Sequence, residues 1–509
     1  MNLRAVGWLL GCLWLLLAAA MLVPAVVAAG YGEQPAFRGC VSAALVTALA
    51  GGTLVLIFNG SKPNSAGRGF FRRELLATVG LAWPSLALFG ALPFLFSGAI
   101  PSVADALFES VAGFTTTAAT VLSDAALDEL ARGLAFWRAL THWLGGMGIV
   151  VVFVLLFPFA GRSPFAESSG LRSERSRARL RDDAFGLLRV YVVLTAAHVA
   201  LLWWFQRDLL DAFVLAFGTL STGGVSNHGA GVRFFGSVQV ELVIVFFMFL
   251  AGVHFGAYHT FRRRGWRAGW KALFGSSEVR VYAGLVVGAT LFVSLGLWFW
   301  GGSNAQPGAA LPDYTRFGRC VRDGLFAVVS HQSSTGYASA NYDLWPDACR
   351  LLLVVLSCVG ACAGSAGGGL KVVRFVIVWR AVLFVIARLA RPREVRFVTL
   401  DHAPLDEGSV GLVCAYGGMW SLVVAAGTLL LLAWGVHAPG FEDQRILTAG
   451  TAVLSCLSNC GPGLAGVGPW ADYAFFPAAS KLLLAILMIL GRLEFAALFV
   501  LLMPRFWRV

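Results

Sequence analysis

Several stretches of this chain are apolar over the length that a helix needs to cross a membrane. Clear examples are residues 6–27, 40–58, 187–205, 238–255, 351–359 with its continuation, 410–434 and 482–503. A helix of roughly 20 apolar residues spans the hydrocarbon core of a bilayer. The chain is 58% hydrophobic and only 13% charged, a composition that soluble domains rarely have. The sequence therefore predicts an all-α, multi-pass membrane protein.

The apolar pattern predicts ten membrane spans, with both termini on the cytoplasmic side. Their approximate bounds are 6–28, 38–58, 74–97, 135–158, 185–205, 236–260, 280–300, 349–386, 411–435 and 478–503. The chain also begins like a signal peptide, with Arg4 before the first apolar stretch and Ala28, Ala29 and Gly30 at its end. This stretch is longer than the hydrophobic part of a typical signal peptide, so we expect a retained first span.

Arginine and lysine give the chain a net charge of +12, and they gather between the apolar stretches. The basic clusters fall within residues 62–73, 162–181, 262–280 and 388–396. Short basic loops of this kind stay in the cytoplasm under the positive-inside rule. No basic and aromatic nucleic-acid module accompanies the charge. Membrane topology therefore explains the clusters, and no nucleic-acid partner is expected.

The nine cysteines do not form a zinc-binding pattern. Two pairs stand four residues apart, Cys358 with Cys362 and Cys456 with Cys460, without histidines nearby. Zinc sites use shorter cysteine spacings or combine cysteine with histidine. We interpret the cysteines as small packing residues. For two other cysteines, Cys320 and Cys349, the alternative is a disulfide on the outer face.

Four further stretches, residues 103–122, 209–227, 321–339 and 446–464, lie between spans on the outer side and share one pattern. In each, a mostly apolar segment that is compatible with a short helix leads into a polar turn. The aligned turn position holds Ala118, Gly224, Gly336 and Gly461. Three residues earlier stand Thr115, Ser221, Ser333 and Ser458, and thirteen residues earlier stand Asp105, Asp211, Asp323 and Thr448. Four such copies predict pseudo-symmetry about an axis along the membrane normal, with the first two spans outside the repeat.

The shared turn suits the binding of a dehydrated cation. Backbone inside a bilayer must hydrogen-bond internally unless it lines a watery cavity, so a short helix ending in a polar turn predicts a re-entrant loop. Four such loops around one axis can direct rings of carbonyl oxygens inward, as in potassium filters. Glycine supplies the positive φ that such a turn requires. We interpret Asp105, Asp211 and Asp323 as caps at the starts of the short helices rather than as ion ligands.

Eight segments, taken in order, resemble the membrane subunits of the Trk potassium-uptake family (the TrkH/TrkG type of the Trk/Ktr/HKT superfamily). They are GFTTT from Gly113, HWLGGMG from His142, STGG from Ser221, STGY from Ser334, YDLWP from Tyr342, GACAGSAGGGLK from Gly360, NCGPG from Asn459 and GRLE from Gly491. The resemblance covers nearly the whole chain, including the two N-terminal spans. It implies four membrane–pore-loop–membrane repeats, a homodimer and a location in a bacterial inner membrane.

The resemblance also divides the chain and assigns a filter. Two N-terminal helices take residues 1–60, and the repeats take 61–161, 162–264, 265–396 and 397–509, with filter loops at 115–119, 221–225, 333–337 and 458–463. The implied potassium filter consists of Thr115, Thr116, Thr117, Ala118, Ser221, Thr222, Gly223, Gly224, Ser334, Thr335, Gly336, Asn459, Cys460 and Gly461.

Ala118 departs from the family pattern, which has glycine at this position. An alanine at positive φ costs about 1 kcal/mol or more, so the first carbonyl group is expected to be aimed differently. In the plant branch of the superfamily, serine at the corresponding position accompanies sodium transport. The preference for K⁺ over Na⁺ therefore stays open at this point.

A glycine-rich segment from Gly360 to Gly369 is predicted to interrupt the span at 349–386, because clustered glycines break helices. The resemblance implies that this segment gates beneath the filter. The implied gate consists of Gly360, Gly364, Gly367, Gly368, Gly369, Lys371 and Arg492. An arginine inside an apolar span is costly unless it is paired or functional, so we expect Arg492 to contact carbonyl groups of this segment. Lys481 is expected to reach the membrane interface with its flexible side chain.

The sequence thus predicts potassium uptake through a four-loop filter, with K⁺ as the transported ion and no cofactor in this chain. The alternative is a sodium-permeable protein or a carrier of the same superfamily that couples K⁺ to H⁺ or Na⁺. Glu241 is the candidate carboxylate for proton coupling. No HExxH or GxSxG motif indicates an enzyme. His228 and His331 are either packing residues or pH-sensitive groups near the outer mouth.

The resemblance implies a cytosolic, nucleotide-binding regulatory partner of the TrkA type in addition to membrane lipid. The chain has no phosphate-binding glycine loop after a strand, so any nucleotide dependence is expected to come from that partner. The arginine-rich loops at 162–181 and 262–280 are candidate docking surfaces for it.

Overall fold

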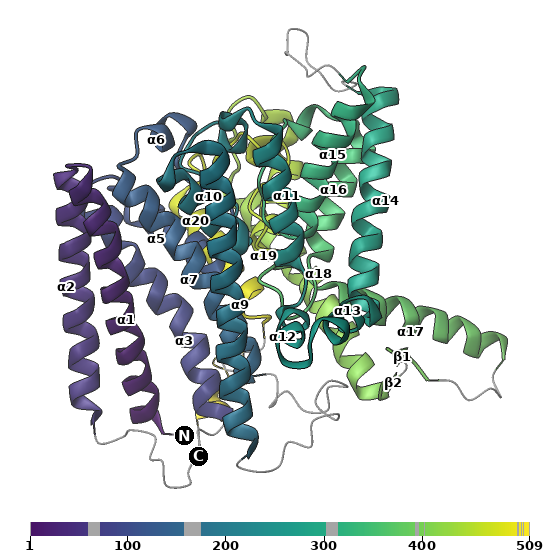
Figure 1. The fold of residues 1–509 in the computed structure, drawn as a ribbon, viewed down its shortest axis with the longest axis horizontal. Coiled ribbons are helices and arrows are strands. Elements are labelled where there is room, and N and C mark those ends of the chain that lie inside the picture. The colour runs from purple at the N-terminus through teal and green to yellow at the C-terminus, as the bar shows by residue number, and fades with distance from the viewer. Residues whose placement is uncertain are drawn as a thin grey trace.

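The computed structural model describes residues 2–59, 72–156, 175–301, 314–391, 397–401, 403–495, 498–499, 501 and 503–507. Within these residues the chain is almost entirely helical, and the ends of the chain lie together at one end of the bundle (Figure 1). A short antiparallel hairpin pairs β1 (Thr399–Leu400) with β2 (Ala403–Pro404). Large parts of the basic clusters at 62–73, 162–181 and 388–396 lie outside the described residues.

α1 (Leu3–Gly30) and α2 (Gln34–Ile57) stand side by side at one edge of the bundle (Figure 1). Their backbones approach closely, because a Cβ atom on Gly11 would lie only 2.9 Å from the carbonyl oxygen of Gly51. Small residues at helix contacts are the usual means of packing spans in a membrane. α1 also packs against α3 and α7, so the predicted first span is an integral part of the bundle.

The remaining elements follow in chain order. The next part of the chain forms α3 (Arg72–Gly90), α4 (Leu92–Phe96), α5 (Val103–Thr115), α6 (Asp124–Asp128) and α7 (Arg132–Leu156). It is followed by α9 (Arg175–Gln206), α10 (Leu209–Leu220), η3 (Gly231–Phe235), α11 (Val238–Gly252), α12 (Phe255–Arg264), α13 (Trp266–Gly275) and α14 (Ser277–Trp300). Then come α15 (Phe317–Gln332), η4 (Tyr342–Leu344), α16 (Asp347–Val359) and α17 (Val372–Ala390). The last are α18 (Glu407–Trp434), η5 (Glu442–Gln444), α19 (Arg445–Leu457), η6 (Ala465–Val467), α20 (Ala478–Arg492) and α22 (Pro504–Trp507).

Six helices among the described residues are long and apolar enough to cross a membrane, as judged by length and composition. They are α1, α2, the segment Arg73–Phe96, the part of α9 at Phe185–Gln206, α14 and α18. The broken pair α11 and α12 raises the number to seven if it counts as one span. The prediction of a multi-pass helical membrane protein is therefore confirmed.

Two predicted spans differ from the structure in shape, and a third is interrupted as predicted. The span at 236–260 bends by 93° between α11 and α12, where His254 caps the new helix by accepting a hydrogen bond from the backbone of Ala257. The span at 349–386 is interrupted between α16 and α17. The span at 478–503 ends as a regular helix at Arg492, since Glu494 and Phe495 take positive φ values. The predicted span at 135–158 ends in residues outside the described set.

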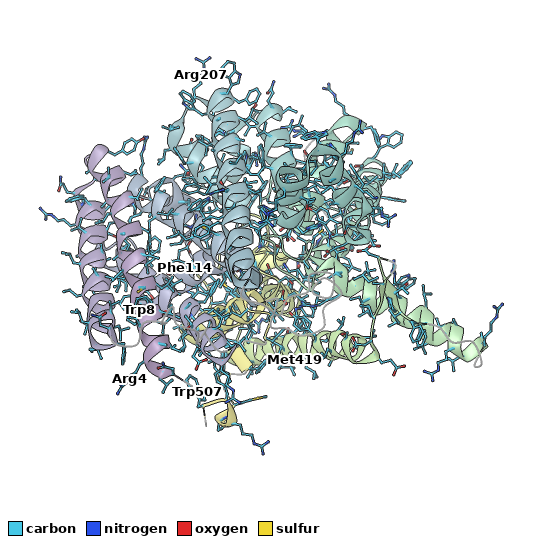
Figure 2. All side chains as sticks on the ribbon, turned by 60° about the horizontal axis from the view of Figure 1, so that its bottom comes forward. Arg4, Trp8, Phe114, Arg207, Met419 and Trp507 are labelled. Atoms are coloured by element: carbon cyan, nitrogen blue, oxygen red, sulfur yellow. The ribbon has the colours of Figure 1, made fainter. Side chains whose placement is uncertain are left out.

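Four half-helices, α5, α10, α15 and α19, lie inside the bundle, and nearly all residues in their C-terminal halves are buried. The apolar core shows how they are grouped. One cluster of buried residues joins the chain before residue 156 with α19 and α20, and a second joins the elements from α9 to α17. The beginning and the end of the chain therefore share a core, which closes the bundle around the half-helices. Figure 2 shows Phe114, at the end of α5, within the bundle, whereas Arg207 and Trp507 mark its opposite ends.

Candidate functional site

The four half-helices end in the same backbone conformation. The residue two positions before the aligned turn position is in the left-handed region in every copy, with φ of 54° at Thr116, 58° at Thr222, 57° at Ser334 and 53° at Asn459. A non-glycine residue in this region is uncommon. Its occurrence at four equivalent positions means that the four half-helices end in one way, up to and including this residue.

The hydrogen bonds of the turns repeat in the same way. The next residue in each copy donates its backbone N–H to a carbonyl oxygen five residues earlier. These bonds run from Thr117 to Ala112 (2.8 Å), Gly223 to Gly218 (2.8 Å), Thr335 to Ser330 (2.8 Å) and Cys460 to Ser455 (3.0 Å). They satisfy carbonyl groups that a helix end would otherwise leave free, as in other left-handed helix caps.

The four aligned turn positions meet in space. A Cβ atom added to Gly224, Gly336 or Gly461 would lie within 2.8 Å of the Ala118 methyl group. The same added atoms would lie 2.1 Å from the carbonyl oxygen of Thr335 at Gly224, and 2.0 Å from that of Cys460 at Gly336. Each glycine therefore faces the backbone of the next copy, and the four turns follow one another around a common centre.

Ala118 avoids the strain that its side chain would create. Gly224, Gly336 and Gly461 have φ values of 57°, 82° and 104°, whereas Ala118 is absent from the residues of positive φ in the described chain. This difference in backbone agrees with the expectation that the first carbonyl group is aimed differently, because alanine at positive φ is costly. The first turn takes another route after Thr116, and its methyl group occupies the space among the three glycines.

The polar side chains of the turns bond mainly to protein rather than point at the centre. Thr115 and Thr117 share a 2.9 Å hydrogen bond, and Asn459 donates from Nδ2 to the Thr117 hydroxyl at 3.1 Å. All three are buried, while Ala118, Gly224 and Gly336 keep partial exposure. Three of the four aligned positions are thus partly accessible, whereas Gly461 is buried, and these side chains hydrogen-bond within the protein.

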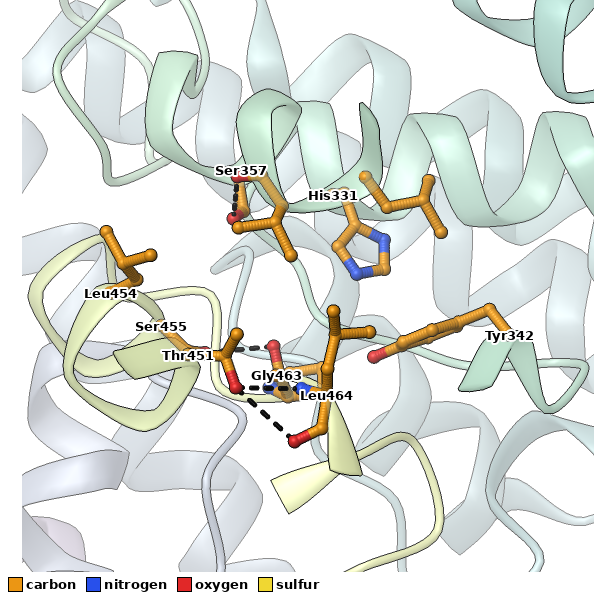
Figure 3. Close-up of a pocket in the computed structure, with 11 residues that line it drawn as sticks. His331, Tyr342, Ser357, Thr451, Leu454, Ser455, Gly463 and Leu464 are labelled. Atoms are coloured by element: carbon orange, nitrogen blue, oxygen red, sulfur yellow. Dashed lines mark hydrogen bonds between the residues drawn. The ribbon is translucent and has the colours of Figure 1, made fainter. Parts of the chain in front are cut away.

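The segments that leave the turns are held by hydroxyl groups. The Tyr337 hydroxyl donates to carbonyl oxygens of the second copy, and the Tyr473 hydroxyl donates to the Gly461 carbonyl oxygen at 2.7 Å. Figure 3 shows the fourth copy, where Thr451 accepts the N–H of Leu464 at 3.0 Å. A small cavity of about 10 Å³ lies beside it, which is room for about one water molecule.

Two of the three predicted caps lie where they were expected. Asp105 and Asp211 are in the first turns of α5 and α10. α15 instead begins at Phe317, because nothing in the six residues before Asp323 stops a helix, so Asp323 lies in the second turn beside Arg319 at 3.8 Å. The interpretation of Asp323 as a cap is therefore wrong. In the fourth copy the buried Thr448 accepts the N–H of Gly466.

Ion pairs and hydrogen bonds tie neighbouring copies together behind the turns. Lys481 was expected to reach the membrane interface, but it is buried and pairs with Asp105 at 2.5 Å. α20 packs against α5, which brings the Asp105 carboxylate within reach of Lys481. Glu241 forms two 2.7 Å hydrogen bonds with Arg322 of the following half-helix.

The two histidines that flank the turns do not share one environment. His228 stacks on Phe234 and lies 3.2 Å from Asp211, so it is engaged at the start of α10. His331 is only 3% exposed and contacts the Ala327 carbonyl oxygen at 2.8 Å. The position of His331 fits a packing residue rather than a group at the outer mouth. Cys320 and Cys349 do not form a disulfide, and neither do the other seven cysteines, all of which lie among the described residues.

The glycine-rich segment lies directly against the third and fourth turns. It separates α16 from α17, and Gly360, Gly364, Gly369 and Lys371 have positive φ. The backbone N–H of Gly368 donates to the Ser334 hydroxyl at 2.6 Å. A Cβ atom on Gly368 would lie 2.2 Å from the Ser458 carbonyl oxygen, and one on Gly367 would lie 2.8 Å from that of Ser333. Close approach of this segment to the turns therefore requires glycine.

Two positively charged side chains donate hydrogen bonds to carbonyl groups of this segment. Arg492 is 3% exposed and donates to the carbonyl oxygens of Ala366 at 2.7 Å and Gly145 at 3.3 Å. The contact between Arg492 and the glycine-rich segment is the one expected from the sequence. Lys371 is buried and donates from Nζ to the Gly367 carbonyl oxygen.

Sequence reasoning assigned no role to several charged residues around the site. Glu278, at the start of α14, accepts hydrogen bonds from the backbone of Ala363 (2.6 Å) and Val373 (3.3 Å), one on each side of the break. Arg374 pairs with Glu494 and lies over the Tyr416 ring at 4.1 Å. Glu109 and Arg138 form a buried pair beside the first turn. The signal was available, because each is a charged residue next to or inside an apolar segment.

The assembled site offers backbone oxygens rather than ionised ligands at its centre. No group of three or more His, Cys, Asp or Glu residues that could hold a metal ion occurs in the described part of the chain. The C-terminal ends of four half-helices point their partial negative charge at the common centre. This arrangement suits a monovalent cation that exchanges its water shell for carbonyl oxygens.

Comparison with known proteins gives a consistent result. Residues 71–508 match the family model described as TrkH, cation transport protein. The chain is 31% identical to the Trk system potassium uptake protein TrkH of Escherichia coli K12 and 26% identical to TrkG of the same strain, in both cases over all of this chain and 99% or more of the relative. It also resembles the crystal structure of the potassium transporter TrkH from Vibrio parahaemolyticus, with a TM-score of 0.87, 29% identity and full coverage of both chains.

Proposed function

Because the chain belongs to the TrkH family of cation transport proteins, we propose that it takes up K⁺ across the bacterial inner membrane through a filter formed by its four turns. The proposed architecture has two N-terminal helices and four membrane–pore-loop–membrane repeats, with the boundaries predicted from the sequence. K⁺ is the cargo, and no resident cofactor is proposed for this chain.

The observation that carries this proposal is the convergence of four turns whose half-helices end in the same way. Their shared left-handed residue and shared hydrogen bond make the copies equivalent, and the contacts of Ala118 with Gly224, Gly336 and Gly461 bring them to one centre. Carbonyl oxygens in that arrangement replace the hydration shell of K⁺. The proposed preference for K⁺ over the smaller Na⁺ depends on the hydrogen bonds around the turns, which hold these carbonyl groups in place.

We further propose that the segment from Gly360 to Lys371 is the gate. In this proposal it closes the ion path on the side of the turns opposite to the segments that follow them. Its contacts with Ser334 and Ser458 support this position. Arg492 and Glu278 hold it in the closed arrangement through backbone hydrogen bonds. Opening the gate then requires movement of α17, which begins at the end of the segment.

The proposal includes a homodimer and a cytosolic nucleotide-binding partner of the TrkA type. α18 supports a further contact in the membrane, because only 17% of its most apolar part is buried within the chain. The partner is proposed to dock on the basic loops, of which residues 162–174 lie outside the described set. Through α17 it would act on the gate, and nucleotide dependence would belong to the partner.

A carrier that couples K⁺ to H⁺ needs a carboxylate that is free to exchange a proton. The candidate, Glu241, is instead held in two hydrogen bonds by Arg322, which supports a structural role. We therefore propose selective conduction of K⁺ in preference to coupled transport.

Growth of a potassium-uptake-deficient bacterial strain tests the proposed function. Expression of the full chain should restore growth at low external K⁺, and added Na⁺ should compete only weakly. Purified protein in lipid bilayers then separates conduction from coupling, because the reversal potential of a K⁺ pore follows the K⁺ gradient alone. Failure to restore growth, together with equal K⁺ and Na⁺ permeability, would refute the proposal.

A further inference from the structure

A buried ion pair joins the segments of chain that follow the first and second turns. Glu109 of α5 is 2% exposed, Arg138 of α7 is 5% exposed, and Arg138 Nε donates to Glu109 Oε1. Burying two charges is costly, and the cost is recovered only when good geometry and further hydrogen bonds satisfy both groups. The remaining partners of this pair are therefore informative about what it does.

Those partners are backbone and hydroxyl groups just beyond the turns. Glu109 Oε2 accepts hydrogen bonds from the Thr120 hydroxyl at 3.0 Å and from the Val121 N–H at 3.1 Å. Arg138 Nη1 donates to the Ser226 carbonyl oxygen at 2.8 Å. Thr120 lies two residues after Ala118, and Ser226 lies two residues after Gly224. The pair thus fixes equivalent points in the segments that follow two neighbouring turns.

The pair occurs only in the copy that lacks glycine. At the same distance before the turn as Glu109, the other copies have Leu215, Ala327 and Ala452. At the same distance after it as Arg138, they have Ile244, Leu356 and Lys481. In the third and fourth copies, the carbonyl group one residue after the aligned position accepts a neutral hydrogen bond, from Ser330 at Tyr337 and from Ser455 at Pro462. A charged brace and an alanine in the turn therefore coincide in the first copy.

The coincidence has a physical reason. The Ala118 methyl group lies among the three glycines at the common centre, so its position sets the width of the path there. The segment that continues through Thr120 and Val121 fixes that position from the outgoing side. Glu109 holds both residues, and the Tyr473 N–H also donates to the Thr120 carbonyl oxygen. We propose that Glu109 and Arg138 are positioning residues that place Ala118 and thereby set the preference for K⁺ over Na⁺. This inference rests on the proposed function.

The test compares K⁺ and Na⁺ permeability of the purified full chain in proteoliposomes. We expect Glu109→Gln and Arg138→Gln each to lower the K⁺/Na⁺ permeability ratio about tenfold, as expected for a weakened hydrogen bond to a charged group. The double variant should lose no more than either single variant, since the two residues act as one unit. Thr120→Val, which keeps the shape of the side chain, should give a smaller loss. Asp105→Asn, which removes a different ion pair of α5, should leave the ratio unchanged.

Replacement of Ala118 distinguishes positioning from general support. In an Ala118→Gly background the effect of Glu109→Gln on the ratio should shrink, because the group that is positioned is gone. An equal effect in both backgrounds, or an unchanged ratio in folded Glu109→Gln and Thr120→Val, would overturn the inference. If Glu109→Gln does not give a monodisperse protein, Thr120→Val decides alone. A wild-type protein without K⁺ preference would instead refute the proposed function.

Discussion

Arg492 donates a 2.7 Å hydrogen bond to the carbonyl oxygen of Ala366, and the two residues are 126 positions apart in the chain. Ala366 belongs to the glycine-rich segment beneath the turns, and Arg492 ends the helix α20. A second hydrogen bond from Arg492 reaches Gly145 of α7. One buried guanidinium group therefore connects the first, third and fourth parts of the bundle at the proposed gate.

Replacing Arg492 with methionine should favour the open gate. The variant keeps an apolar side chain of similar length but removes a charged donor, and such a hydrogen bond contributes about 1.5–3 kcal/mol. We expect K⁺ flux into proteoliposomes without any partner to rise roughly tenfold or more. Arg505→Met, at an exposed position in α22, is the control. Unchanged flux and gating in Arg492→Met would remove Arg492 from the gate.

Glu278 should act on the same segment from the other side. Its carboxylate accepts the N–H groups of Ala363 and Val373, so Glu278→Ala leaves both donors without their partner. We expect a similar increase in partner-independent flux and a further increase when it is combined with Arg492→Met. The matched control is Glu407→Ala, since Glu407 is an exposed acidic residue at the start of α18. A loss of flux in Glu278→Ala would show instead that the carboxylate supports the open state.

The space around two glycines predicts different effects when each is replaced by alanine. Gly336→Ala places a Cβ atom 2.0 Å from the Cys460 carbonyl oxygen at a φ of 82°, so we expect K⁺ uptake to fall to the level of untransformed cells. Gly284→Ala in α14, where an added Cβ meets nothing within 4 Å, should leave uptake unchanged. Growth at low external K⁺ measures both. Normal growth with Gly336→Ala would contradict the proposed filter.

Ala118→Gly should increase the rate of K⁺ uptake. The substitution removes the methyl group from the space among the three glycines, and glycine can then adopt the positive φ of the other copies. We also expect a higher K⁺/Na⁺ permeability ratio, because four equivalent turns can present four equivalent carbonyl groups. Uptake and reversal potential identical to those of the wild type would show that this position is silent.

Asp343 predicts a pH dependence of stability. It lies in the connection between α15 and α16, outside the spans, and burial raises the pKa of its carboxyl group to about 6, although the Ala465 N–H and Arg350 favour the charged form. Because this value lies above the ordinary pKa near 3.8, the stabilising contribution of the neutral acid is complete at low pH and is lost as the pH rises through about 6. Asp343→Asn should therefore lower the dependence of the melting temperature on pH between 5 and 7.

This prediction is checked by thermal unfolding of the detergent-solubilised protein at several pH values. Asp472→Asn serves as the comparison, since Asp472 is an outer-side carboxyl group that hydrogen-bonds only the nearby Ala474 N–H among the bonds described. Its melting temperature should follow the same pH curve as that of the wild type. Parallel curves for wild type and Asp343→Asn would mean that the Asp343 carboxyl group stays charged across this range.

Local patterns allowed much of the site to be predicted before its geometry was known. The polar turns near 118, 224, 336 and 461 and the break at Gly360–Gly369 are visible in sequence because glycine and hydroxyl residues interrupt apolar segments. The contact of Arg492 with the break could also be expected, since a buried charge needs a partner. The errors concern details that depend on neighbours, such as the place of Asp323 within its helix and the partner of Lys481.

The sequence by itself determined that this chain crosses a membrane through helices and carries four similar turns, because both properties follow from composition and order over a few tens of residues. Only the tertiary structure decided which turn faces which, that Lys481 pairs with Asp105 rather than with the interface, and that Glu109 and Arg138 brace the first turn. These choices depend on which helices pack together. Residues such as Lys481 and Asp105, 376 positions apart, leave no local pattern from which their contact can be inferred.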